Sequence, residues 1–214
     1  VYDFPNKRKI HKVKTPIIGG VILLINFIIL IILLEFNLID NLPISNIFEN
    51  KFNYFLFSLS VLLIFLMGFI DDKIDINPNL KLFCFFLIIS FVQYFDSSIL
   101  ITQIRFSFME NFIYLGKYSF FFTVLCFLLF INACNMFDGI NLQSSLYYLI
   151  LSLYLISLDS QNLFLIVMII SIFIICILNS KGKIFMGDSG VFLCSFVLAY
   201  FMVKNYNIKV IDYS

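Results

Sequence analysis

The sequence predicts an all-α integral membrane protein, a polytopic bundle with about seven transmembrane helices. Of its 214 residues, 62% are hydrophobic and 13% are charged, whereas soluble domains have ~45–50% apolar and ~25% charged residues. The apolar residues are also concentrated in seven runs that contain no acidic residue. A soluble fold of this size could not bury so much apolar surface, so lipid must cover part of it.

Each apolar run is interpreted as one membrane-spanning helix. Several runs are shorter than the ~20 residues that a straight span needs, so we expect the helices to extend into the flanking residues. The first run follows a basic segment, as in a signal peptide, but it exceeds the ~7–15 apolar residues of such a peptide. The runs cover residues 17–34, 54–70, 80–95, 119–137, 145–158, 162–178 and 190–203.

Lysine and arginine residues predict which side of the membrane each loop faces. If the first 16 residues are cytoplasmic, nine basic residues lie on the cytoplasmic side and five on the other side, in agreement with the positive-inside rule. The nine are Lys7, Arg8, Lys9, Lys12, Lys14, Lys73, Lys81, Lys181 and Lys183, and the five are Lys51, Arg105, Lys117, Lys204 and Lys209. On the outer side, residues 99–108 partly alternate apolar and polar side chains, which predicts a short strand or hairpin outside the membrane.

Charge and cysteine content argue against two other classes of site. A formal net charge of +1 gives no basis for binding nucleic acid. The five cysteines all lie in apolar runs and show no CxxC spacing. We therefore interpret them as packing residues and not as disulfides or metal ligands.

Three polar groups, far apart in the sequence, fall on the cytoplasmic side when the orientation is chosen from basic residues alone. They cover residues 68–75, 132–141 and 183–190. Apart from Asp3, every acidic residue of the cytoplasmic segments belongs to one of these groups. Because the loops on one face of a helical bundle lie close together, we predict that the three groups form one site.

The first group ends a predicted span with two adjacent carboxylates, Asp71 and Asp72. Neighbouring carboxylates repel each other, and a divalent metal or a phosphate-bound Mg²⁺ would relieve that repulsion. The alternative is a solvated helix end that only stops the span. Asp75 lies one turn further and shares their face if the helix continues, although Pro78 limits that helix.

The second group places Asn132, Asn135 and Asp138 three residues apart at the end of a span. On a helix they fall within roughly a 120° arc. An asparagine in lipid is costly unless it meets a partner, so three polar residues on one arc predict the wall of a polar cavity. The alternative is hydrogen bonding between helices of the bundle. Gly139 allows a sharp turn directly afterwards.

The third group contains the sequence GDSG at residues 187–190. The same four residues surround the nucleophile of chymotrypsin-like proteases, but the sole histidine here is His11 and an apolar span follows at once. We therefore reject a protease. A glycine-flanked carboxylate at a helix start, here Asp188, is suited to a metal ion or a phosphate group.

Together these motifs resemble the polyprenyl-phosphate N-acetylhexosamine 1-phosphate transferase family. The matching stretches occur in family order. They are an entry loop in residues 3–20, a DDxxD motif in 71–75, an NAxNxxDG motif in 132–139 and a KxFMGDxG motif in 183–190. The aspartate at position 75 resembles the N-acetylglucosaminyl branch more than the muramoyl-pentapeptide branch, which tends to have lysine there.

The resemblance implies an enzyme that transfers an N-acetylhexosamine 1-phosphate from a UDP-sugar to a polyprenyl phosphate, such as undecaprenyl phosphate, and releases UMP. It implies a place in the bacterial cytoplasmic (inner) membrane, an active site facing the cytoplasm, and the start of a cell-envelope glycan such as lipopolysaccharide. Because both substrates are anionic, it implies Mg²⁺ as cofactor, with Mn²⁺ possible. The expected partners are both substrates and the lipid bilayer, without nucleic acid; the oligomeric state is left open.

The resemblance also implies roles for single residues. Asp71 or Asp72 is expected to be the base that prepares the lipid phosphate, with a covalent aspartyl route as the alternative. Asp138 is expected at the catalytic centre, where it holds the metal together with Asp188 and Asn135. The expected substrate-binding residues are Lys81, Asn132, Asp75, Gly187 and Lys183.

The sequence departs from the family pattern at both ends. The family has another span before the entry loop and a histidine-containing cytoplasmic loop after further spans, so we expect a single membrane domain over residues 1–214 that is incomplete at both ends. Two rival classes are an intramembrane prenyltransferase, which would need a second Asp-rich motif, and a transporter or channel. A transporter would place ionisable groups near the midplane, whereas the acids here gather at one face.

Overall fold

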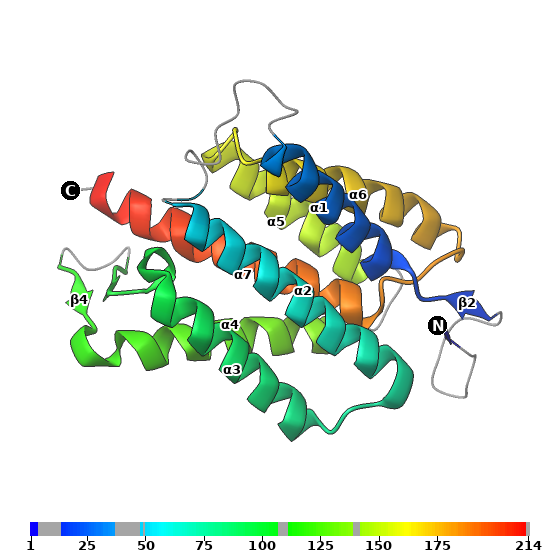
Figure 1. Cartoon of the computed structure of the whole chain (residues 1–214), viewed down its shortest axis with the longest axis horizontal. Coiled ribbons are helices and arrows are strands. Elements are labelled where there is room, and N and C mark those ends of the chain that lie inside the picture. The colour runs from blue at the N-terminus through cyan, green and yellow to red at the C-terminus, as the bar shows by residue number, and fades with distance from the viewer. Residues whose placement is uncertain (4–13, 37–47, 49, 107–110, 139–141, 213–214) are drawn as a thin grey trace.

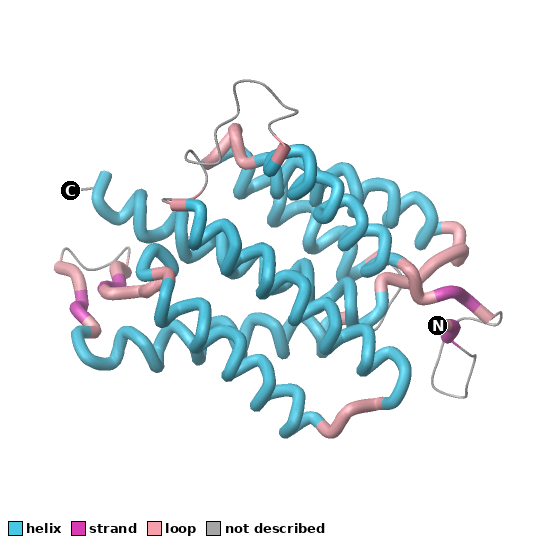
Figure 2. Tube along the Cα trace, in the orientation of Figure 1, coloured by secondary structure: helices cyan, strands magenta, loops and turns pink. Residues whose placement is uncertain are grey.

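The computed structural model describes residues 1–3, 14–36, 48, 50–106, 111–138 and 142–212, except for the side chains of 209–212. These residues form a bundle of seven α-helices with two short β-hairpins (Figures 1 and 2). The helices are α1 (Gly19–Glu35), α2 (Lys51–Ile74), α3 (Pro78–Phe95), α4 (Ser119–Phe137), α5 (Gln143–Leu158), α6 (Leu163–Ser180) and α7 (Gly187–Asp212). The predicted all-α class is confirmed.

Each of the seven predicted spans corresponds to one helix. Five of these helices (α2, α3, α4, α6 and α7) are long and apolar enough to cross a membrane, while α1 and α5 are apolar helices of 17 and 16 residues. The largest difference from prediction is at the end of α7, which continues past the apolar run to Asp212. The added turns attach α7 to the segment that follows α3. Asn207 donates hydrogen bonds to the carbonyl oxygens of Ser98 (2.7 Å) and Leu100 (3.1 Å).

Asparagine side chains begin three of the helices. Asn50, Asn77 and Asn162 accept hydrogen bonds from first-turn backbone amides of α2, α3 and α6, as is common at helix starts. α2 ends before Asp75, whose backbone is left-handed with φ 47°, and Pro78 begins α3. The helix thus does not continue through Asp75, and Asp75 does not share a helix face with Asp71 and Asp72.

Both hairpins are short and antiparallel. β1 (Tyr2–Asp3) pairs with β2 (Thr15–Pro16), a hairpin that the sequence analysis did not predict. β3 (Gln103–Ile104) pairs with β4 (Ile113–Tyr114). The predicted segment 99–108 contains β3 but not its partner, because the alternating pattern that marks one strand does not locate the strand it joins.

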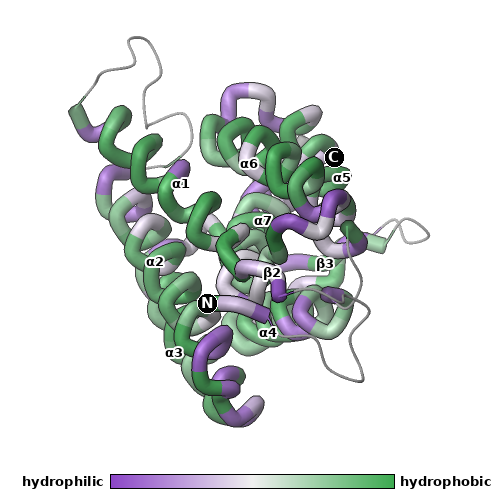
Figure 3. Tube along the Cα trace, turned by 90° about the vertical axis from the view of Figure 1, so that its right-hand side faces the viewer, coloured by the Kyte–Doolittle hydropathy of each residue, from purple (hydrophilic) through white to green (hydrophobic). Residues whose placement is uncertain are grey.

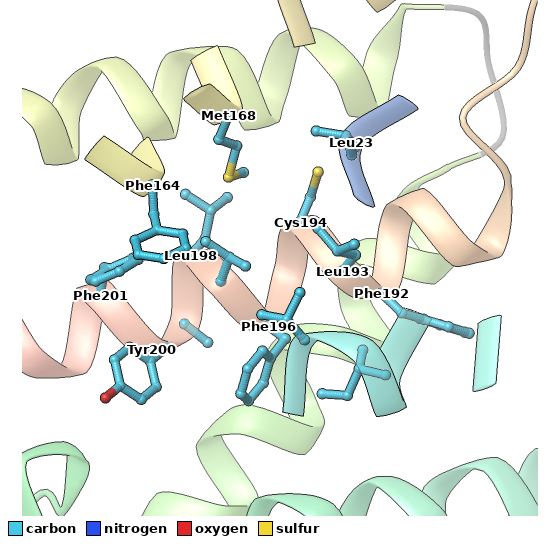
Figure 4. Close-up of a cluster of buried hydrophobic side chains, with 14 of the residues drawn as sticks. Leu23, Phe164, Met168, Phe192, Leu193, Cys194, Phe196, Leu198, Tyr200 and Phe201 are labelled. Carbon is cyan, nitrogen blue, oxygen red and sulfur yellow. The ribbon is translucent and has the colours of Figure 1, made fainter. Parts of the chain in front are cut away.

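Helix α7 forms the centre of the bundle and contacts α1, α2, α4 and α5. In the most apolar stretch of α7, 67% of the residues are buried, whereas 22% are buried in the corresponding stretch of α3. Figure 4 shows Leu23, Phe164 and Met168 of the surrounding helices pointing toward α7 side chains. By contrast, α3 and α4 expose many large apolar side chains, as lipid-facing helices do.

A buried carboxylate joins three elements at the end of the bundle where α2 begins and α3 ends, which we call the far end. Asp96 is 1% exposed. It accepts hydrogen bonds from the side chains of Asn53 on α2 (3.0 Å), Ser98 (2.6 Å) and Tyr200 on α7 (2.5 Å). These donors compensate for the loss of water around the charge.

Candidate active site

The three polar groups of the sequence lie at the opposite end of the bundle, which we call the site end. Helices α2 and α4 end there, and α3 and α7 begin there. In Figure 1 this is the right-hand end, where the β1–β2 hairpin lies, and Figure 3 views the bundle from that end. The structure thus brings together segments that are more than a hundred residues apart in the chain.

Two glycines let α2 and α7 approach closely at the site end. A Cβ atom on Gly68 would lie 2.5 Å from the Cα atom of Ser189, a distance that real Cβ atoms essentially never show. Gly187 has φ +74°, a backbone conformation that other residues rarely adopt, and a Cβ atom there would lie 2.9 Å from Oδ2 of Asp72. The last turn of α2 therefore packs directly against the first turn of α7.

Asp72 caps the start of α7 from the neighbouring helix. Its Oδ1 accepts a hydrogen bond from the backbone amide of Asp188 (2.8 Å). Its Oδ2 accepts bonds from the amide (3.2 Å) and the hydroxyl (2.8 Å) of Ser189. A carboxylate is stabilised at a helix start by the free amides and the helix dipole. The two amides that could have received a substrate phosphate thus already bind a carboxylate of the chain.

Asp71 lies beneath the surface and is 2% exposed. It forms an ion pair with Lys81 of α3 and accepts a hydrogen bond from the amide of Ile76 (2.8 Å). The carboxyl group of Asp188 lies close to that of Asp71. Two charged carboxylates so close together would repel each other, and a bound cation would relieve that repulsion.

Asp138 follows the last residue of α4, where the Ser144 hydroxyl at the start of α5 donates a hydrogen bond to it. Burial raises the pKa of Asp138, the Ser144 hydrogen bond lowers this pKa, and the nearby negative charge of Asp72 raises it. The net result is a pKa above the ordinary range of an aspartate. A cation close to Asp138 would favour its charged form.

A small pocket lies beside the carboxylates, between α3, α4 and α7. Its volume is about 140 Å³, and its polar lining consists of Lys81, Asn132 and Asn135. The other lining residues are Pro78, Leu82, Phe85 and Phe192. One ammonium and two amide groups beside an apolar wall suit a ligand that carries both an anionic or hydroxyl group and an apolar part.

Two of the expected substrate-binding residues stand apart from this cluster. Asp75 and Lys183 are exposed, and within the described parts of the chain neither side chain forms a hydrogen bond or ion pair with the carboxylates. Gly187 contributes its backbone conformation and not a contact. Gly139 and most of the entry loop (4–13) lie outside the described residues.

Among the described residues, Ser144 and Asn179 lie outside the three predicted polar groups and contact the site through their side chains. Ser144 holds the Asp138 carboxyl, and no sequence feature distinguishes it from the adjacent Ser145. The Asn179 side chain bonds to the backbone amide of Leu142, after Asp138, and to the carbonyl oxygen of Ile184, before Asp188. Its position at the end of an apolar run was a usable signal, because an asparagine there needs a partner.

The donor set suits a magnesium ion that arrives with a phosphate. Among the described residues, no group of three or more histidine, cysteine or acidic side chains is arranged to hold a metal. Mg²⁺, however, is usually bound by one or two carboxylates together with water and substrate phosphates. The paired carboxyl groups of Asp71 and Asp188 fit that requirement, because a cation would relieve their repulsion.

Comparison with known families decides the class. The sequence model described as glycosyl transferase family 4 matches residues 54–205. The chain belongs to glycosyl transferase family 4. The match runs from α2 into α7 and includes all three polar groups. Membership of glycosyl transferase family 4 confirms the resemblance stated above and makes the protein a membrane sugar-phosphate transferase, in preference to a prenyltransferase or a transporter. No curated protein matches the chain.

Proposed function

We propose that the protein transfers an N-acetylhexosamine 1-phosphate from a UDP-sugar to a polyprenyl phosphate, at the cytoplasmic face of the bacterial inner membrane. The observation that carries the proposal is the cluster at the site end. There Asp71, Asp72 and Asp188 meet Lys81 at the ends of apolar helices. Such a position allows a soluble nucleotide and a lipid headgroup to reach the same groups.

The proposed reaction is a substitution at phosphorus. An oxygen of the lipid phosphate forms a bond to the phosphorus that carries the sugar, and the bond from that phosphorus to the UMP oxygen breaks. A phosphate monoester loses its second proton at a pKa of about 6. The attacking group is therefore largely a dianion at neutral pH, and the protein need not supply a strong base. Positioning and charge neutralisation then provide most of the catalysis.

This chemistry and the geometry suggest roles that differ from the sequence expectation for two aspartates. Asp72 already uses both carboxylate oxygens on α7, and Asp71 is buried beside Lys81. We propose that both are positioning residues, Asp72 for the start of α7 and Asp71 for Lys81. Lys81 would contact a substrate phosphate, and Asn132 a polar group of the donor, since both line the pocket.

Mg²⁺ is the proposed cofactor, with Mn²⁺ as an alternative. Asp188 would hold the ion with a substrate phosphate, with Asp138 and Asn135 as further oxygen ligands, directly or through water. When bound, the metal would offset the negative charge of the two substrates. Asp71 lies beside the Asp188 carboxyl and would help to position it.

The direct test measures UMP release and lipid-extractable sugar. Membranes containing the protein are supplied with Mg²⁺, undecaprenyl phosphate and a set of UDP-N-acetylhexosamines, which also identifies the sugar. Asp188→Asn is expected to lower turnover by at least about a hundredfold, because it removes a charge where negative charge must be neutralised. The matched control is Asp159→Asn, since Asp159 lies at the far end and contacts Asn162.

The proposal fails if correctly inserted wild-type protein releases no UMP with any donor. It also fails if Asp188→Asn and Asp159→Asn retain equal activity. Metal-independent turnover would leave the transfer reaction intact and overturn only the proposed cofactor.

A further inference from the structure

Asn179 connects two segments near Asp138 and Asp188, the start of α5 and the residues that lead into α7; we call them the two loops. It lies in the last turn of α6 and is 6% exposed. Its Oδ1 accepts a hydrogen bond from the amide of Leu142 (2.7 Å), and its Nδ2 donates one to the carbonyl oxygen of Ile184 (2.9 Å). Leu142 lies four residues after Asp138, and Ile184 four residues before Asp188.

Both loops need such support. Leu142 has φ +69°, in the left-handed region that a leucine seldom adopts, and it begins the helix whose Ser144 bonds to Asp138. Ile184 is 4% exposed, so its carbonyl oxygen has little access to water. Without Asn179, a backbone donor and a backbone acceptor would each lose a partner in a place where water cannot easily replace it.

The primary amide of asparagine can make both bonds because it carries an acceptor oxygen and a donor nitrogen. Aspartate offers acceptors without a donor, and leucine has the same approximate size without either group. The neighbouring turn is fixed independently, because the amide of Gly182 donates to the Asn179 carbonyl oxygen (2.8 Å). The side chain is therefore free to act between the loops while the backbone holds the end of α6.

We propose that Asn179 is a positioning residue that sets the spacing between Asp138 and Asp188. The inference rests on the proposed function, in which both carboxyl groups face the same metal-bound phosphate. Because one amide bonds to both loops, the starts of α5 and α7 are held at a fixed distance from each other at the site end. Asn179 belongs to none of the motifs. We expect it to affect the reaction only by holding the backbone of the two loops in place.

The test compares Asn179→Leu and Asn179→Asp with Asn162→Leu and Asn162→Asp. Asn162 is the matched control because it is also buried and also bonds through both side-chain groups, to Asp159 and to the amide of Leu165, but at the far end. Turnover number, KM and the Mg²⁺ concentration for half-maximal rate are measured at a temperature where all variants remain folded. Amide hydrogen exchange of residues 142–145 and 184–187 is measured in parallel.

We expect both Asn179 variants to lower the turnover number on the order of a hundredfold and to raise the Mg²⁺ requirement, with KM changed less. We also expect faster exchange in both loops, a change that the Asn162 variants should not show. Equal loss of activity in the Asn162 and Asn179 variants, or unchanged exchange at Leu142 in Asn179→Leu, would overturn the inference.

The two proposals fail in different ways. If the wild-type protein is inactive, the proposed function fails, whereas exchange still reports whether Asn179 holds both loops. If the wild-type protein is active and the Asn179 variants match it, the positioning role fails alone.

Discussion

Replacing Gly68 by alanine tests the contact on which the site end depends. The added Cβ atom would lie 2.5 Å from Cα and 2.6 Å from N of Ser189, both backbone atoms that cannot rotate away. Ordinary contact begins at 3.4 Å, so α2 and α7 would have to separate by about 0.9 Å, a form of overpacking that costs about 1–3 kcal/mol.

The same displacement would weaken the capping of α7. If the helices part along the bond from the Asp188 amide to Asp72, its 2.8 Å length becomes about 3.7 Å, which is no longer a hydrogen bond. A shift of about 1 Å in a reacting group can cost on the order of a hundredfold in rate. We therefore expect Gly68→Ala to remain in the membrane, to unfold at lower temperature, and to lose about a hundredfold in UMP release.

Gly116→Ala is the control for that experiment. Gly116, unlike Gly68, has a positive φ, +52°, and nothing lies within 4 Å of the position of its Cβ atom. We expect a stability loss of about 1 kcal/mol from the left-handed backbone and no loss of turnover. Wild-type activity in Gly68→Ala, at wild-type stability, would refute the reasoning that close packing of α2 on α7 sets the site.

Three further predictions follow from the contacts of the aspartates. Asp72→Ala should lower turnover more than Asp72→Asn, because asparagine keeps one oxygen for the start of α7; equal rates in the UMP assay would contradict the capping role. Asp96→Ala should lower the unfolding free energy by about 2–4 kcal/mol, since it strips the acceptor from the buried donors of Asn53 and Tyr200, and activity should persist below the unfolding temperature. Chelation of divalent metal should abolish UMP release and added Mg²⁺ should restore it, whereas thermal unfolding in detergent without substrate should shift little, because the protein alone offers an incomplete set of ligands.

The sequence predicted the helices better than their arrangement. Lipid requires every backbone group of a span to bond within its own helix, so the apolar runs marked all seven helices. Sidedness then predicted that Asp71, Asp138 and Asp188 would share one end of the bundle. Hydropathy does not distinguish a central helix from a lipid-facing one, and the central position of α7 is a result of packing.

The details of the site depend on contacts between distant residues. The bond from Ser189 to Asp72 joins positions 117 residues apart, and no local pattern of the sequence encodes such a distance. The sequence analysis interpreted Asp188, a glycine-flanked carboxylate at a helix start, as suited to a metal ion or a phosphate group, and it did not predict what the backbone amides of that helix start bind. The neighbouring helix supplies a carboxylate to those amides, which is visible only once the two helices are placed.

The two ends of the α2–α7 pair are fastened by carboxylates, Asp72 at one end and Asp96 at the other. Apolar contacts alone define the register between two helices in lipid poorly, because sliding one helix by one residue replaces one apolar contact with another. A slip of one residue displaces a helix by about 1.5 Å along its axis. Such a slip would break the polar bonds at both ends at once. A shifted pairing of α2 and α7 is therefore destabilised at two places, which favours one alignment during folding in the membrane.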